Sequence, residues 1–492
     1  MKYRNHQSYL LVLAFLCSFQ WAFGQHYSEI LQYATTEANG SARTVGVGAG
    51  LSALGADMGA ITQNPAGLAR YRRSEMNITI GLDNISTDAT FGTNTTNTTK
   101  SLMQLPSVGM VFTSRPENIK WKTMNFSVGY NRQLSYNRNA FFEGSATGSI
   151  IQKFAAEANG LGLDELDGFG AGLAYDALGI YDDDGDKHYE SDFDGVVDSF
   201  YHAQDFSERG NMGEITVALA GNYEDRLSIG LSIGIPVLSL QKEKSYEEID
   251  KDSSILYFDR LKFDESVKTT GAGFNLKLGM IYQINQAVRA GLAIHSPTWL
   301  NLNDSFSNTF NYEYTDANGP SANEKNSEQG VFEYKVVTPW RAVGSLGAII
   351  ARKGFISADV ELVDYTTGRF NLTSDLKTPE TQELEKENNK AIKKNYRQAF
   401  NFRVGGEYAM DAFRFRAGLG LYGSPIINDD TYKMIYSAGL GYRKDDFFVD
   451  LAYRLNQSTE GYSPYDGDFM KPNGAVLKTQ RSTIALTLGV KF

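Results

Sequence analysis

Hydrophobic and polar side chains alternate along most of this chain. In residues 481–492 the apolar Ile484, Leu486, Leu488 and Val490 fall on one face, and mostly polar or small residues fall on the other. Successive side chains of a β-strand point to opposite faces, so this pattern predicts a strand with one apolar face. Similar alternation recurs in many segments, for example 227–235, and indicates an all-β protein.

Six tight turns separate pairs of alternating runs and allow the strands to be counted. Each turn predicts one hairpin, so the six turns supply twelve strands. A first strand at 74–83 and a last strand ending at Phe492 bring the predicted total to fourteen. The turns lie at 114–121, 223–226, 285–287, 352–354, 410–412 and 443–446.

Seven longer, polar segments alternate with these turns. Short turns at one end and long loops at the other are typical of an even-stranded outer-membrane barrel. We therefore predict a 14-stranded antiparallel transmembrane β-barrel over residues 74–492. The segments 257–263 and 309–314 are either extra strands or protruding extensions. The predicted external loops are 85–104, 137–213, 244–268, 303–330, 373–394, 424–430 and 458–478.

The composition agrees with a barrel and argues against other classes. After the first 24 residues, no apolar run approaches the roughly eighteen residues that a transmembrane helix needs. The chain contains 48 Gly, 28 Tyr and 29 Phe with only 21% charged residues, a balance typical of strands that face lipid on one side. The net charge of −11 argues against a nucleic-acid partner.

Residues 1–24 have the pattern of a secretory signal peptide. Lys2 and Arg4 precede an apolar run at 9–19, and small residues near Gly24 stand at the usual cleavage spacing. Cleavage after Gly24 would remove Cys17, the only cysteine, so we expect neither a disulfide nor cysteine chemistry in the mature chain. Leu16 stands where a lipoprotein signal needs a small residue, which argues against lipidation.

Charged side chains alternate with apolar ones in the later strands. A charge that faces lipid is costly, so we expect these residues to face the lumen. They either form an ion-paired network that fills the lumen and sets the strand register, or they line a polar path for a ligand. Buried charges ordinarily need partners, which favours the network. The residues are Asp359, Glu361, Arg403, Glu407, Arg414, Arg416, Asp450 and Arg454.

A segment rich in Gly and Ala precedes the first strand. It keeps apolar residues such as Val45, Leu51 and Ile61, whereas a flexible linker would be polar. Asn64 and Pro65 suit a helix N-cap followed by a proline at the first helical position. We interpret residues 25–73 as a compact plug, or hatch, inside the barrel.

These motifs resemble a known family. The Gly-x-Ala-Arg opening at 40–43, the Gly-rich run to Gly50, the small-residue stretch with Asp57, and Asn64-Pro-Ala-Gly-Leu68 are similar to the N-terminal hatch of the FadL family. That family transports long-chain fatty acids and other hydrophobic compounds across the outer membrane. It usually has a second Gly where Ala49 stands and an acidic pair at 57–58, where this chain has Asp-Met.

The resemblance implies transport without catalysis by a fourteen-stranded outer-membrane barrel. In the family, a hydrophobic small molecule is captured outside, moves to an interior pocket near the hatch, and leaves sideways into the outer-membrane lipid beside a kinked strand. Gly129 is a candidate for the kink. By the same resemblance, the hatch or gate residues are Asn64, Pro65, Ala66 and Gly67.

Two kinds of protein partner enter the interpretation. The terminal strand ending at Phe492 resembles the signal that the barrel assembly machinery recognises. A rival function is that of a surface-protein shuttle, because similar barrels of the PorV type hold secreted proteins at the cell surface in the Bacteroidetes-type secretion machinery.

The external loop 137–213 is the longest of the predicted loops. Residues 146–158 have helical spacing and predict either a helix that caps the mouth or an ordinary surface helix. The apolar residues that follow are interpreted as the first capture surface for a hydrophobic ligand. They include Leu161, Leu163, Leu166 and Phe169.

Acidic residues then cluster at 182–198. Glu190, Asp192 and Asp194 match the start of a calcium-binding loop, because oxygen ligands at alternate positions suit Ca²⁺. Tyr201 stands at the twelfth position in place of Glu, and a solvated acidic loop explains the cluster without a metal. We therefore expect no cofactor, with Ca²⁺ as the only candidate ion.

The sequence gives little support for an enzyme. His295 lies beside Ser296 in a predicted strand, but adjacency in sequence does not create the geometry of Ser-His catalysis. A histidine that lines the lumen explains the pair better.

Overall fold

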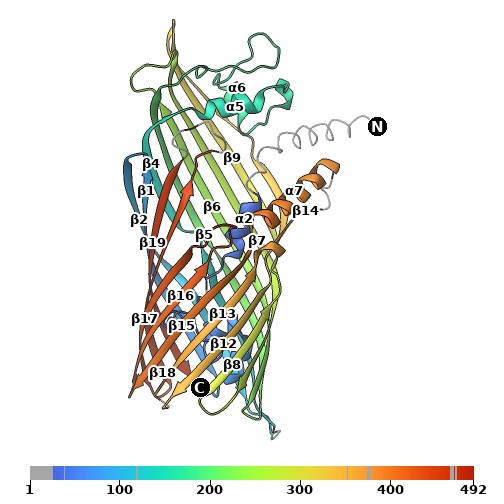
Figure 1. Ribbon diagram of the computed structural model, residues 1–492, viewed down its shortest axis with the longest axis vertical. Helices are drawn as coiled ribbons and strands as arrows, with labels where there is room; N and C mark the ends of the chain where they lie inside the picture. The colour runs from blue at the N-terminus through green and yellow to red at the C-terminus, as the bar shows by residue number, and fades with distance from the viewer. Residues whose placement is uncertain are drawn as a thin grey trace.

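The strands of this protein form one antiparallel sheet that closes into a barrel (Figure 1). The computed structural model describes residues 26–37, 39–117, 120–351, 353–373, 378–465, 470 and 474–492. The signal peptide predicted for 1–24 lies outside the described residues.

The barrel wall has fourteen strands in the described part of the chain, as predicted. They are β1 (Glu75–Phe91), β2 (Asn94–Ser114), β3 (Trp121–Ser135), β5 (Ser199–Tyr223), β6 (Leu227–Ile249), β7 (Phe258–Gln283), β8 (Val288–His295), β12 (Arg341–Ile350), β13 (Gly354–Asp364), β15 (Gln398–Met410), β16 (Phe413–Gly423), β17 (Tyr432–Lys444), β18 (Phe447–Tyr462) and β19 (Ala475–Lys491). Further segments prolong these strands on the external side. They are β4 (Arg138–Thr147), β9 (Trp299–Asp316), β10 (Gly319–Asn326), β11 (Gly330–Val337) and β14 (Arg369–Leu372).

The first and last strands close the barrel. β1 pairs with β19 from Glu75 opposite Lys491 to Thr90 opposite Val476, which confirms the predicted pairing of the two ends. On the lumen side of this seam, the hydroxyls of Thr79 and Thr487 lie 2.7 Å apart and share a hydrogen bond. Closure pairs the backbone groups that an open sheet edge would expose to lipid.

The six predicted turns all join consecutive strands at one end of the barrel, at the bottom of Figure 1. β15 ends at Met410 and β16 begins at Phe413, for example. In this turn Asp411 has a positive φ of 51°, and Asp445 has the same φ between β17 and β18. Asp tolerates the left-handed conformation better than most residues, which suits it to these tight turns.

Three predicted external loops are largely strand. β1 and β2 run through the segment 85–104 and turn only at 92–93, β6 and β7 cover most of 244–268, and β9 and β10 cover most of 303–330. The segments 257–263 and 309–314 are accordingly protruding extensions. A strand that stands in water needs no apolar outer face, so these extensions lack the alternation on which the prediction depended.

The outward side chains of the lower barrel are apolar and exposed. Leu231 is 47% exposed and Ile484 is 46% exposed, whereas the inward-facing neighbours Ser232 and Ala485 are buried. Outer-membrane barrels carry such an apolar band where lipid surrounds them. The protein therefore presents its hydrophobic surface to the bilayer and its polar surface to the lumen.

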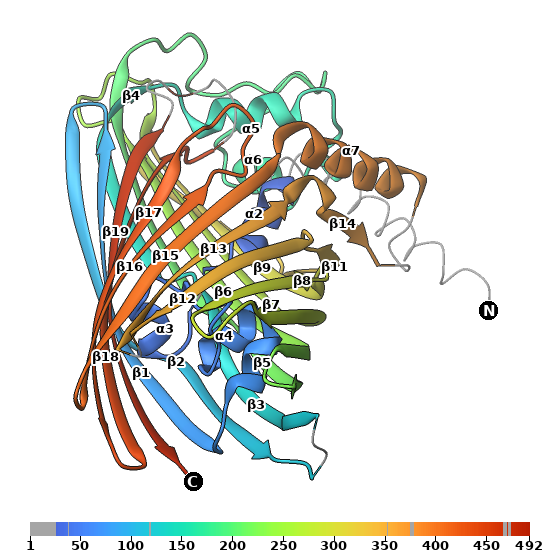
Figure 2. The same cartoon turned by 60° about the horizontal axis from the view of Figure 1, so that its bottom comes forward.

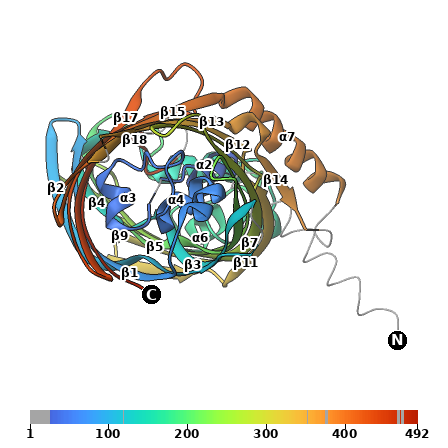
Figure 3. The same ribbon diagram turned by 90° about the horizontal axis from the view of Figure 1, so that it is seen from below.

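Short helices of the N-terminal region lie within the ring of strands (Figure 3). They are α2 (His26–Ala34), α3 (Ala42–Gly46), α4 (Met58–Gln63) and the 3₁₀ helix η3 (Pro65–Arg70). Small residues permit this close packing, since a Cβ added at Gly46 would lie 3.2 Å from the Cα of Gly439 in β17. The predicted plug is confirmed. Over the described residues, no helix combines the length and apolar character needed to span a membrane.

Helices and strand extensions cover the external end. α5 (Ile150–Ala158), η4 (Leu163–Glu165) and α6 (Ala171–Asp176) lie at the top of Figure 1, and we call this region the lid. The ring of Phe154 packs on Phe263 and Phe310 of the extensions, with centroids 5.5 and 6.0 Å apart. The 3₁₀ turn η5 (Tyr365–Thr367) and the helix α7 (Pro379–Asn395) follow β13, and α7 lies along the outer rim (Figure 2).

Replacing Leu231 by Arg tests which face meets lipid. The change places a charge among outward apolar residues of β6, so we expect the free energy of unfolding in lipid vesicles to fall by about 2–4 kcal/mol, measured by urea titration. Leu256→Arg is the matched control, because Leu256 is 71% exposed at the tip of an external hairpin and should change stability by less than about 0.5 kcal/mol. Equal losses in both variants would contradict the assignment of the lipid face.

Candidate functional site

A buried carboxylate joins two helices of the hatch. Asp57 is the N-cap of α4 and accepts a hydrogen bond from the backbone N–H of Gly59 at 2.9 Å. It also accepts from the hydroxyls of Ser41 at 2.7 Å and Thr44 at 2.5 Å, both at the start of α3. Because one side chain caps α4 and bonds to α3, the two helices are held as one unit.

The predicted gate residues 64–67 connect α4 to η3. Asn64 ends α4 and caps η3, since its Oδ1 accepts from the N–H of Ala66 at 3.1 Å, and Pro65 stands at the first helical position as expected. The Asn64 amide also donates to the carbonyls of Ser52 at 2.9 Å and Met280 at 3.3 Å. The gate segment is thus bonded both to the hatch and to strand β7.

Glycines let the gate segment touch the wall. A Cβ added at Gly230 of β6 would lie 2.4 Å from the carbonyl carbon of Pro65, and one added at Gly279 of β7 would lie 2.0 Å from Oδ1 of Asn64. Within the hatch, a Cβ added at Gly67 would lie 3.0 Å from the Cα of Gly55. Such contacts leave no room for a ligand, so passage at this level requires the hatch to move.

Most of the predicted lumen charges form ion pairs. Arg416 lies between Glu407 at 2.6 Å and Asp450 at 2.8 Å. Arg403 pairs with Glu361 at 3.0 Å, and its guanidinium lies 3.9 Å from Asp359. Arg403 thus meets carboxylates of the neighbouring strand β13, whereas Arg416 joins Glu407 of the neighbouring strand β15 to Asp450 of β18, which lies two strands away on the other side.

The hatch supplies partners that sequence reasoning missed. Arg43 of α3 pairs with Glu407 at 3.2 Å, and Ser52 donates to Asp359 at 2.6 Å. Arg454 reaches the linker between α2 and α3, where it lies 3.4 Å from Glu37. These residues are hundreds of positions from their partners in the sequence. The one indication that the hatch would supply partners was the large number of lumen charges that needed them.

Arg414 is an exception to the predicted network. It lies at the turn end of β16, and its guanidinium donates to the backbone carbonyls of Asp411 at 2.8 Å and Phe413 at 2.7 Å. Its alternation with Arg416 placed it on the correct face, but it lies one residue from the turn and bonds to the backbone there.

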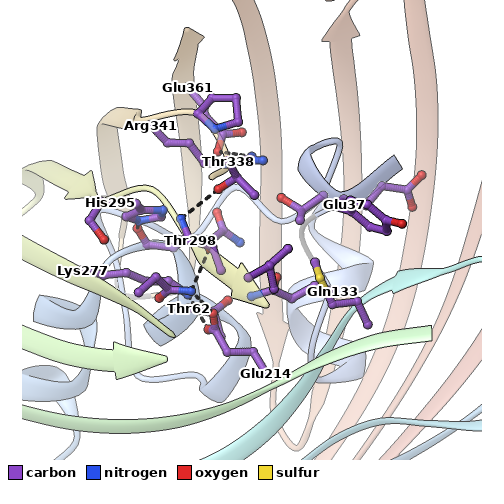
Figure 4. A pocket seen from close by; sticks show the side chains of 18 of the residues that line it. Glu37, Thr62, Gln133, Glu214, Lys277, His295, Thr298, Thr338, Arg341 and Glu361 are labelled. Atoms are coloured by element: carbon purple, nitrogen blue, oxygen red, sulfur yellow. Dashed lines mark hydrogen bonds and ion pairs between the residues drawn. The ribbon is translucent and has the colours of Figure 1, made fainter. Parts of the chain in front are cut away.

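A polar pocket of about 80 Å³ lies in the lumen beside Thr62 and Gln63 of α4, and Figure 4 shows the side chains that line it. Lys277 forms an ion pair with Glu214, and Arg341 pairs with Glu361 at 3.3 Å. The pocket also receives Thr62 of α4 and Glu37 of the linker. Its charges are neutralised within the protein, so it offers polar contacts rather than a net charge to a ligand.

Two broken strands border this pocket. β8 stops at His295 and resumes as β9 at Trp299, and β11 stops at Val337 and resumes as β12 at Arg341. A proline at 297 and another at 339 interrupt the two ladders because proline has no N–H to donate. The backbone N–H of Thr298 donates to the Thr338 hydroxyl at 2.9 Å, which joins the two breaks.

The Ser-His adjacency has a structural role. Nε2 of His295 donates to the carbonyl of Gln63 in α4 at 2.7 Å, and the Ser296 hydroxyl donates to the carbonyl of Pro297 at 2.8 Å. The two side chains bond to different groups, and His295 helps to hold the hatch.

The predicted capture residues lie along the lid in different environments. Leu163 is 56% exposed, Leu166 is partly buried against the lid core, and Leu161 is half-buried. The ring of Phe169 packs on Phe306 with centroids 4.8 Å apart. Only part of this stretch is therefore open to a ligand approaching from outside.

The calcium-loop residues have separate partners. Asp192 accepts from the Tyr312 hydroxyl at 2.7 Å, and Asp194 accepts from the Ser191 hydroxyl at 3.1 Å. Glu190 is exposed, and its backbone pairs with Tyr181. In the described ranges, no group of three His, Cys, Asp or Glu side chains is placed to hold a metal ion.

A buried carboxylate fastens the lid to the wall. Glu248 lies in the external extension of β6, eleven positions beyond Val237, which is exposed on the outward face. It accepts from the Ser149 hydroxyl and from the N–H of Ile150 at 2.8 Å, both at the start of α5. The Tyr246 hydroxyl donates to Glu248 at 2.8 Å and also bonds Nδ1 of His202 at 2.7 Å.

Burial shifts the pKa values of Glu248 and His202 in opposite directions. It raises the pKa of Glu248 from 4.5 to about 7 and lowers the pKa of His202 from 6.5 to about 4. The contribution of Glu248 to lid stability is full below pH 4.5 and is lost as the pH rises through 7. The contribution of His202 is full above pH 6.5 and is lost as the pH falls through 4.

The comparisons with known proteins support one family. A family model described as "Outer membrane protein transport protein (OMPP1/FadL/TodX)" matches residues 192–491. None of the curated proteins compared matches the chain. The crystal structure of a Pseudomonas aeruginosa FadL homologue aligns with a TM-score of 0.55 at 12% identity, over 92% of this chain and 98% of that chain. That of the Pseudomonas putida toluene transporter TodX aligns with a TM-score of 0.50 at 12% identity over the same shares. At this identity the alignments show a shared fold.

Removing the Arg416 guanidinium should destabilise the barrel strongly. Arg416→Met leaves Glu407 and Asp450 buried without this partner, so we expect a loss of about 3–5 kcal/mol in the free energy of unfolding, measured by urea titration in vesicles. Arg414→Met is the matched control, since the Arg414 guanidinium donates to backbone carbonyls at the turn and its loss should cost less than about 1 kcal/mol. A small effect at Arg416 would show that the ion pairs do not stabilise the lumen.

Single substitutions at Glu248 and His202 should separate the opposite effects that these groups have on the stability of α5 as the pH changes. We expect little change in the stability of α5 in the wild type between pH 6.5 and 4.5, because the two contributions nearly cancel. Glu248→Gln should make α5 less stable as the pH falls, and His202→Phe should make it more stable. Hydrogen exchange of α5 amides, corrected for intrinsic rates, measures both trends. Glu190→Gln, at an exposed site of the lid, should leave the wild-type profile unchanged.

Proposed function

From the fact that this chain belongs to the OMPP1/FadL/TodX family of outer-membrane transport proteins, we propose that it takes up hydrophobic compounds, such as long-chain fatty acids, across the outer membrane. The family is one of outer-membrane transport proteins, and the protein is not an enzyme.

The observation that carries the proposal is the packed hatch. Its helices contact the wall on several sides, from Gly46 against β17 to Pro65 against β6. A small polar solute would need a continuous water-filled path, as in a porin. A hydrophobic solute has another route, because the surrounding bilayer is itself a favourable destination.

We place the lateral exit beside β3, β5 and β6. An apolar groove of about 470 Å³ lies on the outer surface there, lined by Phe112, Met124, Phe126, Leu219 and Ile229 among others. These side chains belong to the lipid-facing set. A ligand that passed this wall would remain among apolar groups and would not cross the aqueous lumen.

The hatch touches the inner side of the same wall. The amide of Asn125 in β3 donates to the carbonyls of Leu68 at 2.7 Å and Tyr71 at 3.1 Å. A Cβ added at Gly129 would lie 2.4 Å from Cε of Met58 in α4. Movement of the hatch would therefore release β3 near the glycine that the sequence indicated.

A disulfide between hatch and wall tests this function. A Cβ added at Gly46 lies 3.6 Å from the Cβ of Ala452 in β18, a spacing that a disulfide accepts. We expect Gly46→Cys with Ala452→Cys to stop uptake of radiolabelled palmitate and toluene when oxidised and to recover it on reduction. The single-cysteine variants are the controls, and their uptake should not respond to oxidant.

The outcome separates transport from the shuttle function. Uptake that is equally fast in the oxidised and reduced double variant would contradict a moving hatch. Stable complexes with secreted proteins, combined with unchanged uptake on deletion of the gene, would favour a surface-protein shuttle.

A further inference from the structure

The apolar groove on the outer wall lies at the turn end of β3, β5 and β6. This groove, which we call the β3 groove, has a volume of about 470 Å³, within the ~300–1,000 Å³ typical of ligand sites. Its lining side chains point outward, and Leu219 and Met124 are 60% and 53% exposed. The β3 groove therefore opens to the bilayer and not to the lumen.

Two local features of the backbone create the hollow. The pairing of β3 with β5 shifts by one residue between Trp121 and Thr123, so Lys122 is the extra residue of a bulge. Opposite the bulge, Gly221 of β5 has no side chain, and a Cβ added there would lie 2.6 Å from Cζ3 of Trp121. The Trp121 ring is fixed from the other side by Tyr223, with centroids 5.4 Å apart.

The bulge places a cationic side chain at the end of the groove. Thr123 faces inward, where its hydroxyl donates to the carbonyl of Ala69 at 3.0 Å. Side chains alternate along a strand, so Lys122 shares the outward face with Met124. Lys122 is exposed, and it forms no ion pair with the residues that the structure describes. A lysine in this position lays its aliphatic stem along apolar surface and directs its ammonium to the polar interface.

Further basic side chains surround this end of the groove. The turns 114–121 and 223–226 are adjacent, since the N–H of Glu224 donates to the carbonyl of Lys120 at 2.7 Å. Arg115 donates to the carbonyl of Arg72 at 2.9 Å, and Arg72 pairs with Asp225 at 2.6 Å. The local charge is positive, although the whole chain carries −11. We call Arg72, Arg115, Lys120, Lys122 and Arg226 the basic cluster, and the acidic residues beside it are Glu117, Glu224 and Asp225.

The basic cluster lies at the depth of lipid head groups. Short turns stand at the periplasmic end of outer-membrane barrels, so this end of the wall borders the inner leaflet. Trp121, Tyr223 and Tyr282 stand at the turn ends of their strands, as interfacial aromatic residues do. Arg226 donates to the Tyr282 hydroxyl at 3.3 Å. The phosphates of the head groups accept hydrogen bonds from guanidinium and ammonium groups.

We propose that the β3 groove and the basic cluster bind one anionic phospholipid of the inner leaflet, with an acyl chain in the groove and the phosphate against Lys122 and Arg115. A zwitterionic lipid has no net charge, so it gains less from the excess of basic side chains. The inference goes beyond the proposed function, because it holds for whichever molecule the barrel transports. A ligand that left through the wall here would enter the bilayer beside this lipid.

The fluorescence of Trp121 tests the occupant, because bromine atoms on a lipid chain quench a tryptophan that they touch. Trp299→Phe with Trp340→Phe leaves Trp121 as the sole tryptophan after residue 24. The protein is placed in phosphatidylcholine vesicles that contain brominated phosphatidylglycerol or brominated phosphatidylcholine at equal mole fractions. Quenching over a range of mole fractions gives the relative affinity, and we expect about a tenfold preference for the anionic lipid.

Substitutions in the basic cluster should remove this preference. Arg115→Gln with Lys122→Gln, whose folding is verified by heat-modifiable mobility, should bring the two lipids to equal quenching. Lys444→Gln is the matched control, because Lys444 is exposed at another turn and should leave the preference unchanged. Equal quenching by both lipids before these substitutions would overturn the inference. An unchanged preference in the double variant would also overturn it.

A second reporter separates a bound lipid from a general attraction of anionic lipid to the barrel. Trp299 stacks on Phe274 on the outward face, with centroids 4.8 Å apart. With Trp121→Phe and Trp340→Phe it is the sole tryptophan after residue 24, and it should show no preference. The same preference at Trp299 as at Trp121 would overturn the inference.

The same measurement distinguishes other occupants of the groove. Brominated stearate should quench Trp121 less than the anionic phospholipid does, and stronger quenching would assign the groove to a free fatty acid. Replacing chloride by inorganic phosphate at equal ionic strength should keep the preference, whereas its loss would show that free phosphate fills the basic cluster. Weak quenching by both lipids would indicate that a second copy of the chain covers the groove. Each of these contrary results would overturn the inference.

Discussion

The pairing of β1 with β19 is the constraint on which the rest of this protein depends. No water is present in the hydrocarbon core to bond an open strand edge, so the sheet must close. Closure joins residues about four hundred positions apart, such as Thr79 and Thr487. It also creates a lumen, which the hatch and the inward-facing charges fill.

The lumen is filled by opposite charges shared between wall and hatch. Arg416 joins two strands through Glu407 and Asp450, and Glu407 in turn holds Arg43 of the hatch. Buried ion pairs of this kind add little stability compared with an apolar core, but breaking one is costly. The arrangement therefore suits a plug that sits in one register within a polar lumen.

The two ends of the lumen differ in chemistry. On the external side, aromatic residues of the lid and the apolar cluster around α2 provide hydrophobic surroundings. Below them lies the polar pocket with Lys277, Arg341 and their carboxylate partners, and then the hatch. A hydrophobic molecule moving inward thus meets apolar surface first, and the outer groove beside β3 offers apolar surface again.

The pattern along the chain was sufficient for the membrane-embedded part of the fold. Lipid requires apolar side chains at every second position, so the segments around Leu231 and Ile484 show their strands and turns directly. The same local logic identified Asn64 and Pro65 as the start of a helix in the hatch. Outside the membrane this requirement is absent, which is why the strands through 85–104 and 303–330 were expected to be loops.

The sequence by itself determined the barrel, its closure between first and last strands, the internal hatch and the resemblance to an outer-membrane transport family, because each rests on a local pattern. Only the tertiary structure decided the partners of Arg43 and Arg454, the tether from Glu248 to α5, and the burial of α2 in an apolar cluster. Those contacts join segments that are distant in sequence. The physical reason is that a side chain inside a closed barrel contacts residues of the opposite wall and of the plug that lie at the same depth, and the local sequence pattern does not specify which residues these are.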